Sequence, residues 1–369
     1  MTAAPAGREF GSTLLVGTEK GLFRLRPGQG SGAWRIDGPH LAGYRILNTV
    51  VTPGQPRELL AAADHPVWGS HIYRSNDAGE HWTSLDATPQ HPPGRHAQSL
   101  KSIWHLAWSP DNRMLYAGVD PAGLFASDDG GESWRDVPAL NDHPMREAWE
   151  PSRGLFAVHS ICIDRQDPSR LVVAVSAGGV YRSEDAGATW AAANEGVRAE
   201  NLPERFPAAG HNVHRVVMHP RDGQRLYRQC YNGTYRSDDG GRSWLEITGD
   251  LPSDFGYAIA CDPFDPDTVF QIPESSSHLR TTVEGRLRVF RSTDAGRRWI
   301  SASAGLPQRH AYVTVLRDAM DADPQRPGQL AFGTSSGHVF TSRDHGDRWE
   351  LAAEFLPRVA SVRFVPAAG

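Results

Sequence analysis

The sequence predicts an all-β fold, a seven-bladed β-propeller with four strands in each blade. The main observation is that the phrase S-x-D-x-G-x-x-W occurs six times in the 369 residues, with successive copies 50 to 56 residues apart. This period fits one four-stranded blade. The second observation is that β-rich stretches come in the same order before each phrase. The copies begin at Ser75, Ser127, Ser183, Ser237, Ser292 and Ser342.

Each phrase is expected to form the hairpin between the third and fourth strands of a blade. The serine hydroxyl and the aspartate carboxylate can bond to backbone amides of the turn, and the glycine can adopt a positive φ. The tryptophan is expected to pack between neighbouring blades. This role accounts for all six aspartates, so we interpret them as turn-stabilising groups and not as acid–base catalysts.

The unit around the second phrase shows the strand order. Its strands are expected at 105–108, 115–119, 123–127 and 134–137, named A to D from the axis outward. The other units repeat this order. The predicted blades are 12–36 with 359–365, then 44–86, 103–138, 157–193, 213–248, 257–302 and 311–353.

The first unit lacks the phrase and an A strand. It keeps TLLVGTEKGLFRL and Trp34, which supply strands B, C and D, while the stretch 359–365 has the character of an A strand without a blade of its own. We therefore expect the C-terminal strand to complete the N-terminal blade. This closure removes the exposed edges of the ring.

Composition and charge narrow the classes of function. The chain is 22% charged and 39% hydrophobic, and no apolar run approaches the roughly 18 residues that cross a bilayer, so no membrane association is expected. A net charge of -5 without a basic cluster argues against nucleic-acid binding. Cys162, Cys230 and Cys261 form no CxxC pair, which argues against a disulfide framework and a thiolate zinc site. Residues 1–10 carry no secretory signal, so a cytoplasmic location is expected.

The six phrases resemble the Asp boxes of the BNR-repeat superfamily, which includes sialidases, sortilin-type receptors and photosystem assembly factors. Nearly the whole chain is similar to bacterial BNR-like or sialidase-like repeat proteins. The resemblance implies the propeller fold. It implies little about the reaction, because the motif that carries it is structural.

The two faces of the predicted ring differ. The A-to-B turns are short and the C-to-D turns are the boxes, so that face is interpreted as structural. The D-to-A connections on the other face are long, and a B-to-C insertion joins them; they span 86–102, 139–156, 192–212 and 273–286. Long ordered loops are commonly functional, so we expect the site where they converge over the axial channel.

Polar side chains are predicted to gather at this channel mouth. Counting back from the A-to-B turns places one residue of each innermost strand at an equivalent position: Leu47, either Trp104 or His105, His159, His214, Tyr257, Asp318 and Ala360. Of these, His105, His159 and His214 are candidate ligands for a divalent metal such as copper, iron or zinc, with Asp318 as an alternative to His105. The alternative is that each histidine bonds to a backbone carbonyl.

The candidate catalytic residues are Tyr257 and Asp318 at the channel mouth, with Arg146 and Glu150 from the loop motif NDHPMREAWE. They predict an enzyme acting on a small-molecule substrate, either metal-dependent (an oxidoreductase or hydrolase) or a metal-free lyase or hydrolase.

Two further functions stay open. A binding or assembly propeller without catalysis would use Trp68, Trp104 and Trp149 to stack on a ligand or protein partner. A sialidase-type glycosidase would need an arginine cluster, a Tyr–Glu pair and an Asp acid. The sequence Tyr44-Arg45-Ile46-Leu47 is similar to the Y-R-I-P motif that opens sialidase domains, but lacks the proline, and no motif identifies two further arginines.

Overall fold

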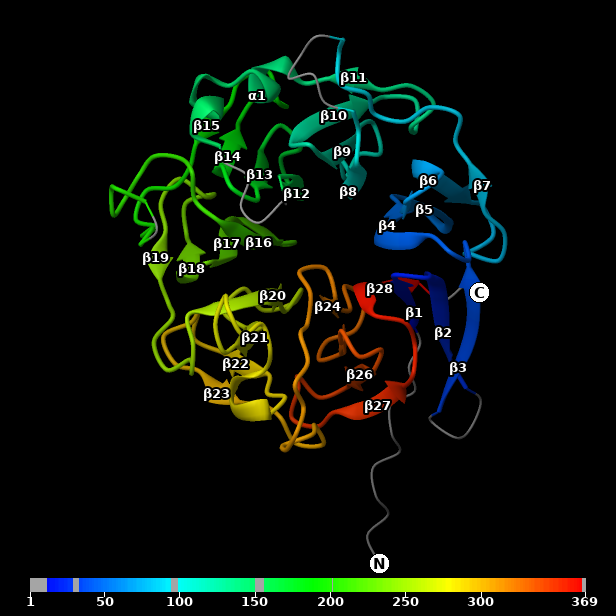
Figure 1. The fold of residues 1–369 in the computed structure, drawn as a ribbon, viewed down its shortest axis with the longest axis vertical. Helices are drawn as coiled ribbons and strands as arrows, with labels where there is room; N and C mark the ends of the chain where they lie inside the picture. Colours follow the sequence, from blue (N-terminus) through cyan, green and yellow to red (C-terminus); the bar gives the residue numbers. More distant parts are fainter. Residues whose placement is uncertain (1–11, 29–32, 94–98, 150–155, 201, 367–369) are drawn as a thin grey trace, which may run out of the picture.

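Seven four-stranded antiparallel sheets stand around a central axis in a computed structural model of the chain (Figure 1). The structure describes residues 12–28, 33–93, 99–149, 156–200 and 202–366. This arrangement confirms the predicted seven-bladed propeller. Among the described residues there is no helix with the length and apolar character needed to span a bilayer.

The first blade joins the two ends of the described chain. It contains β28 (Val359–Pro366), β1 (Ser12–Thr18), β2 (Gly21–Pro27) and β3 (Trp34–His40), in that order from the axis. Strand β28 pairs antiparallel with β1, with Val362 opposite Val16 and Phe364 opposite Leu14. The predicted closure by the C-terminal strand is therefore confirmed.

The other six blades follow in chain order, each with its first strand innermost. The second blade has β4 (Arg45–Thr52), β5 (Gln55–His65), β6 (Gly69–Ser75) and β7 (Thr83–Ser84). The third has β8 (Ser102–Trp108), β9 (Leu115–Asp120), β10 (Gly123–Ser127) and β11 (Arg135–Asp136). The fourth has β12 (Val158–Ile163), β13 (Leu171–Val175), β14 (Gly179–Ser183) and β15 (Ala191–Ala192).

The fifth blade has β16 (Val213–His219), β17 (Asp222–Cys230), β18 (Gly233–Ser237) and β19 (Leu245–Glu246). The sixth has β20 (Phe255–Cys261), β21 (Val269–Glu274), β22 (Phe290–Ser292) and β23 (Ile300–Ser301). The seventh has β24 (Met320–Ala322), β25 (Leu330–Gly333), β26 (Val339–Ser342) and β27 (Glu350–Ala353). Among the described residues, three short helical segments lie in connections: α1 (Pro138–Asn141), η1 (Pro144–Ala148) and η2 (Val283–Gly285).

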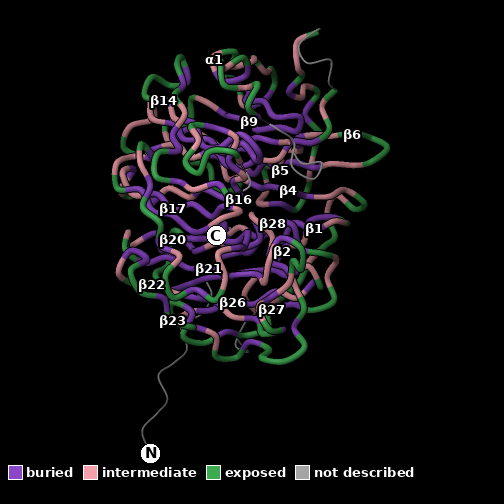
Figure 2. Tube along the Cα trace, turned by 60° about the vertical axis from the view of Figure 1, so that its left-hand side comes forward, coloured by how far each residue is buried: buried purple, intermediate pink, exposed green. Residues whose placement is uncertain are grey.

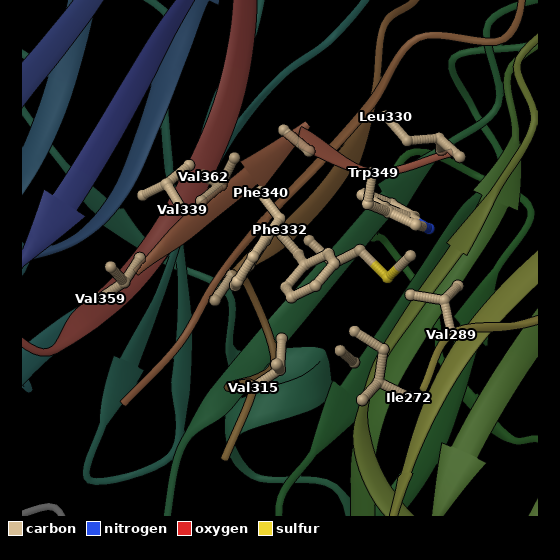
Figure 3. Packing of buried hydrophobic residues seen from close by; sticks show 14 of the residues in the cluster. Ile272, Val289, Val315, Leu330, Phe332, Val339, Phe340, Trp349, Val359 and Val362 are labelled. Carbon is tan, nitrogen blue, oxygen red and sulfur yellow. The ribbon is translucent and has the colours of Figure 1, made fainter. Parts of the chain in front are cut away.

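The core lies between the faces of adjacent blades. Strands such as β13, with the sequence LVVAV, are buried along their whole length because both faces pack against neighbouring sheets. Figure 2 shows buried residues through the interior and exposed residues mainly in turns and outer strands. Figure 3 shows the contact that closes the ring, where Val339 of the seventh blade lies next to Val362 of β28, while Trp349 lies on the other side of the cluster, toward Val289.

The six boxes have one geometry. In every box the serine Oγ donates to the aspartate Oδ1 at 2.7 or 2.8 Å and accepts from the glycine N–H at 2.7 to 2.9 Å. The tryptophan Nε1 of the last three boxes, at Trp244, Trp299 and Trp349, donates to a carbonyl of the preceding blade at 2.8 or 2.9 Å. The expected turn-stabilising role of the boxes is confirmed.

Candidate functional site

A cavity of about 290 Å³ opens at one end of the axial channel. Its lining comes only from the starts of innermost strands, from B-to-C connections and from D-to-A connections. This is the face on which the sequence predicts a site. The lining residues are Glu19, Arg45, Leu47, Trp104, Ser176, Asn212, His214, Tyr231, Phe255, Tyr257, Arg280, Thr314, Leu316, Arg317, Asp318, Arg358 and Ala360.

A one-residue β-bulge at the entry of the innermost strands turns side chains toward this cavity. The pairing of innermost and second strands shifts register at the same place in six blades, leaving one residue unpaired in each: Leu47, Trp104, His159, His214, Tyr257 and Ala360. Five of the six line the cavity, and Asp318 occupies the matching place in the seventh blade. Bulges commonly re-aim side chains at functional sites in this way. The predicted equivalence is correct, and Trp104, not His105, is the matching residue of the third blade.

The three candidate metal ligands do not converge on one point. Nε2 of His159 donates to the Val213 carbonyl at 3.0 Å, and Nδ1 of His214 donates to the Gly256 carbonyl at 2.6 Å, so both rings link neighbouring innermost strands. His105 lies one position deeper, with its Nδ1 3.4 Å from the Asn48 amide nitrogen. Within the described ranges, no three or more His, Cys, Asp or Glu side chains are placed to hold a metal ion. The backbone-carbonyl interpretation therefore fits His159 and His214, and the predicted metal site has no support in this part of the chain.

The same histidines are held neutral by their surroundings. Burial, together with the charges of Arg317 and Arg215, lowers the pKa of His159 well below its ordinary value. Burial lowers the pKa of His105 to about 3. Neutral rings suit the hydrogen bonds to carbonyls, because a single ring N–H is enough for each.

Asp318 lines the cavity and is paired across the channel. Its carboxylate forms an ion pair with Arg215 from the fifth blade, and its Oδ1 is 3.7 Å from Nδ1 of His105 in the third blade. Asp318 is only 6% exposed. The structure thus places a carboxyl group in direct contact with a guanidinium at the channel mouth.

Tyr257 belongs to an aromatic wall on one side of the cavity. Its ring centroid is 4.5 Å from that of His214 and 5.3 Å from that of Phe255, and Tyr231 packs against Phe255 at 5.7 Å. Trp104 faces the cavity from the third blade. Apolar walls with a few convergent polar groups are typical of small-molecule sites.

Four arginines also line the cavity. The repeat positions of the sequence did not predict any of them as a site residue. Arg45 is paired with Asp64 at 2.5 Å. Arg317 lies over the rings of Tyr257 and Trp104, with its Cζ 4.8 and 5.9 Å from their centroids. Arg280 comes from the B-to-C insertion of the sixth blade, and Arg358 from the segment before β28. The sequence motif with Arg45 therefore lies beside three arginines that no motif identifies.

Glu274 is the last residue of β21 and lies behind the part of the cavity wall that carries Arg280 and Arg317. No pattern in the sequence identified it as a site residue. The residue is 1% exposed, and neither carboxyl oxygen has a hydrogen-bond partner of good geometry among the described residues. Burial raises the pKa of Glu274 to about 8, although the nearby Val315 N–H, the charges of Arg280 and Arg317 and the Thr314 hydroxyl each lower it. Glu274 is therefore a carboxylic acid that stays protonated at neutral pH.

The remaining predicted residues lie elsewhere. Arg146 in η1 donates from Nη2 to the Ala122 carbonyl at 2.7 Å and stacks on Trp149, away from the cavity lining. Trp149 is buried and donates to the Tyr181 hydroxyl at 2.5 Å, so it presents no ring for a ligand. Trp68 is exposed at the turn between β5 and β6. Glu150 lies outside the described residues.

Comparison with known proteins gives partial similarities. No protein-family model matches the chain. A xyloglucanase from a Paenibacillus species is 26% identical over 263 residues, which is 64% of this chain and 24% of that protein. The xyloglucanase Xgh74A of Acetivibrio thermocellus is 29% identical over 146 residues, 36% of this chain and 16% of that protein. The chain thus spans a quarter or less of the length of these curated relatives.

Solved structures show the same fold. The GH74 xyloglucanase from Xanthomonas campestris superposes with a TM-score of 0.65 at 19% identity, covering 94% of this chain and 53% of that one. YCF48 bound to D1 peptide superposes with a TM-score of 0.56 at 12% identity, covering 100% of this chain and 98% of that one. The protein is therefore a seven-bladed β-propeller similar to GH74 and YCF48 propellers.

Proposed function

We propose that this protein is a glycoside hydrolase whose active site is the channel-mouth cavity. The curated relatives that it resembles at low identity are xyloglucanases. The observation that carries the proposal is that the channel mouth carries aromatic rings and the carboxylate of Asp318, with the buried carboxyl group of Glu274 behind its wall. Hydrolysis of a glycosidic bond uses this combination, with one carboxyl protonated and the other ionised.

The aromatic wall would bind the sugar rings. Trp104, Tyr231, Phe255 and Tyr257 offer apolar surface on two sides of the cavity. The cavity volume of about 290 Å³ suits one or two sugar units, since small-molecule sites begin at roughly this size.

The two carboxyl groups, of Glu274 and Asp318, would have different roles in the reaction. Glu274, kept protonated by burial, would act as the general acid that protonates the leaving oxygen. Asp318, in contact with the Arg215 guanidinium, would act on the anomeric carbon directly or through a water molecule. Asp318 faces the cavity, whereas Glu274 stands behind Thr314 and must turn toward it during the reaction.

The test is release of reducing ends from xyloglucan oligosaccharides and a panel of aryl glycosides by the purified chain. We expect turnover, and a loss of at least about 100-fold in Asp318→Asn. Asp239→Asn on the box face is the matched control, because it changes the same type of side chain far from the cavity. A folded wild-type protein that hydrolyses none of these glycosides contradicts the proposal.

A binding function without catalysis is the second candidate, and a specific observation favours it. Large apolar side chains are exposed on the loops around the channel mouth: Val67, Trp68, Met145, Phe206, Leu279, Tyr312 and Phe355. Exposed apolar groups that gather on one face are typical of interaction surfaces. YCF48, whose whole length the chain matches in fold, was solved with a bound peptide. Peptide-array binding that is lost in Trp68→Ser/Phe355→Ser, together with absence of glycan turnover, would support this candidate.

A further inference from the structure

One position deeper than the residues that face the cavity, the innermost strands form a second layer of side chains. Its members directly follow the bulges, at the point where pairing with the second strand resumes, and all of them are buried. They are Asn48, His105, Ser160, Arg215, Ala258 and Ser361. Because three members of the layer are small, a long side chain in it can extend across the channel.

Arg215 is the long side chain of this layer, and it crosses the channel from the fifth blade to the seventh. Its Nη1 donates to Oδ1 of Asp318, which lies 103 residues away in the sequence. Arg215 is 8% exposed and Asp318 is 6% exposed. A hydrogen bond from a guanidinium in a buried place is strong and directional, because water does not compete for either group.

We infer that Arg215 is a positioning residue for catalysis, which holds Oδ1 of Asp318 and so leaves Oδ2 available to the substrate. The inference rests on the proposed glycoside hydrolase function and adds the group that sets the geometry of its carboxylate. Arg215 is not among the residues that line the cavity. It therefore acts through Asp318 and does not touch the substrate.

The second oxygen of Asp318 has a defined position at the cavity. Asp318 lines the cavity, and no hydrogen bond within the described ranges engages its Oδ2. The main chain is fixed as well, since the Asp318 carbonyl accepts from the Val362 N–H of β28 at 2.8 Å. Placement of this kind matters for the rate, because a misplacement of about 1 Å can cost about 100-fold.

His105 and Asn48 approach the same carboxyl group but leave Arg215 as its donor. Oδ1 of Asn48 accepts from the Leu106 N–H at 3.1 Å, which turns its Nδ2 toward Nδ1 of His105 at 3.4 Å. An amide nitrogen only donates, so Nδ1 of His105 accepts and cannot donate to Asp318, 3.7 Å away. In the described part of the chain, Arg215 is thus the one side chain that donates a hydrogen bond to this carboxyl group.

Steady-state kinetics of Arg215 variants tests the inference, on the glycoside of the panel that the wild type hydrolyses fastest. We expect Arg215→Met to lower kcat by about 100-fold and to change KM by less than about threefold, because the contacts to the substrate remain. Arg215→Lys should have a kcat at least about tenfold above that of Arg215→Met, since an ammonium can still donate to Oδ1. Arg215→Gln keeps a neutral donor and should fall between them, and it replaces Arg215→Met if that variant does not fold.

Arg236→Met is the matched control. Arg236 lies in the same blade, is 7% exposed and donates from Nη1 to the Ala295 carbonyl of the next blade at 2.7 Å, but it stands on the box face. Its replacement also removes a buried guanidinium, so it should lower the free energy of unfolding and leave kcat unchanged.

The outcomes separate the inference from the proposed function. Wild-type turnover with an unchanged kcat in Arg215→Met overturns the inference and leaves the proposed function standing. A higher KM at constant kcat also overturns it, because Arg215 would then be a binding residue, and so does an equal loss of kcat in the Arg236 control. If the wild type hydrolyses no glycoside, the proposed function fails and the inference fails with it.

Discussion

The two faces of the propeller differ in whether their polar groups have hydrogen-bond or ion-pair partners within the described chain. On the box face, six hairpins satisfy the same serine, aspartate and glycine groups with the same short hydrogen bonds. On the mouth face, three arginines lack ion-pair partners within the described chain and Glu274 is buried without a good hydrogen bond. Satisfied polar groups stabilise a fold, whereas unsatisfied ones mark places where a ligand or a reaction completes the site.

The exposed apolar side chains follow the same division. Among the described residues, those that are large and exposed lie either on the outermost strands or on loops of the mouth face; Ile36, Leu245, Ile300 and Leu351 form the first group. In the described part of the chain, no large exposed apolar side chain lies on a turn of the box face. The comparison therefore predicts that changes on the box face alter stability, and that changes on the mouth face alter binding, catalysis or the response to pH.

The largest stability effect is expected from Trp244→Ala on the box side. Trp244 is 5% exposed, and its Nε1 donates to the Ala193 carbonyl of the preceding blade at 2.9 Å. Removing the ring leaves a cavity between two blades and should lower the free energy of unfolding by about 3–5 kcal/mol. Chemical denaturation measures this, with Trp68→Ala as the exposed control. A loss similar to that of the control would mean that the box tryptophans do not join the blades.

A smaller effect on stability is expected from Glu274→Gln on the mouth side. It arises from protonation, whereas the effect of Trp244→Ala arises from packing. Burial raises the pKa of Glu274 from its ordinary value to about 8, so between pH 6.5 and 8 the folded state holds a proton that the unfolded state has lost. Stability should therefore fall as pH rises through this window, by about 2 kcal/mol for this group. The glutamine variant should lack that part of the fall.

The pH window separates Glu274 from the buried histidines. Burial lowers the pKa of His105 to about 3, so its contribution to stability is lost as pH falls below 6.5 and is constant above it. Denaturation of wild type and variant at pH 6.5 and at pH 8 isolates the carboxyl group. If both proteins lose stability equally between these pH values, Glu274 is already ionised in the folded state.

The smallest effect is expected from Ala186→Gly within the third box. Ala186 is exposed and has a φ of 57°, a left-handed conformation that a Cβ disfavours. Glycine removes that cost but gains entropy in the unfolded chain, so the net stabilisation should be about 0.5 kcal/mol. Thermal unfolding can resolve the shift. Destabilisation instead would show that the box geometry holds the alanine without strain.

The sequence by itself determined the fold and the face that carries the cavity. The six repeated boxes specify the length of one blade, and the unpaired strand at 359–365 specifies ring closure. Both depend on local turn chemistry and strand pattern. Counting from the turns also placed His214, Tyr257 and Asp318 at matching positions, since regular strands keep register with their turns. The bulge decided between Trp104 and His105, and no pattern in the sequence marks it.

Only the tertiary structure decided which charges meet. Arg280 and Arg358 come from irregular connections, whereas Arg317 directly precedes Asp318, and ring closure brings the three to one cavity. Whether Asp318 is paired depends on Arg215, 103 residues away, and the protonation of Glu274 depends on burial behind the wall that carries Thr314. Hairpins are specified by neighbours in sequence, whereas the charge state of a site depends on every group that folding places around it.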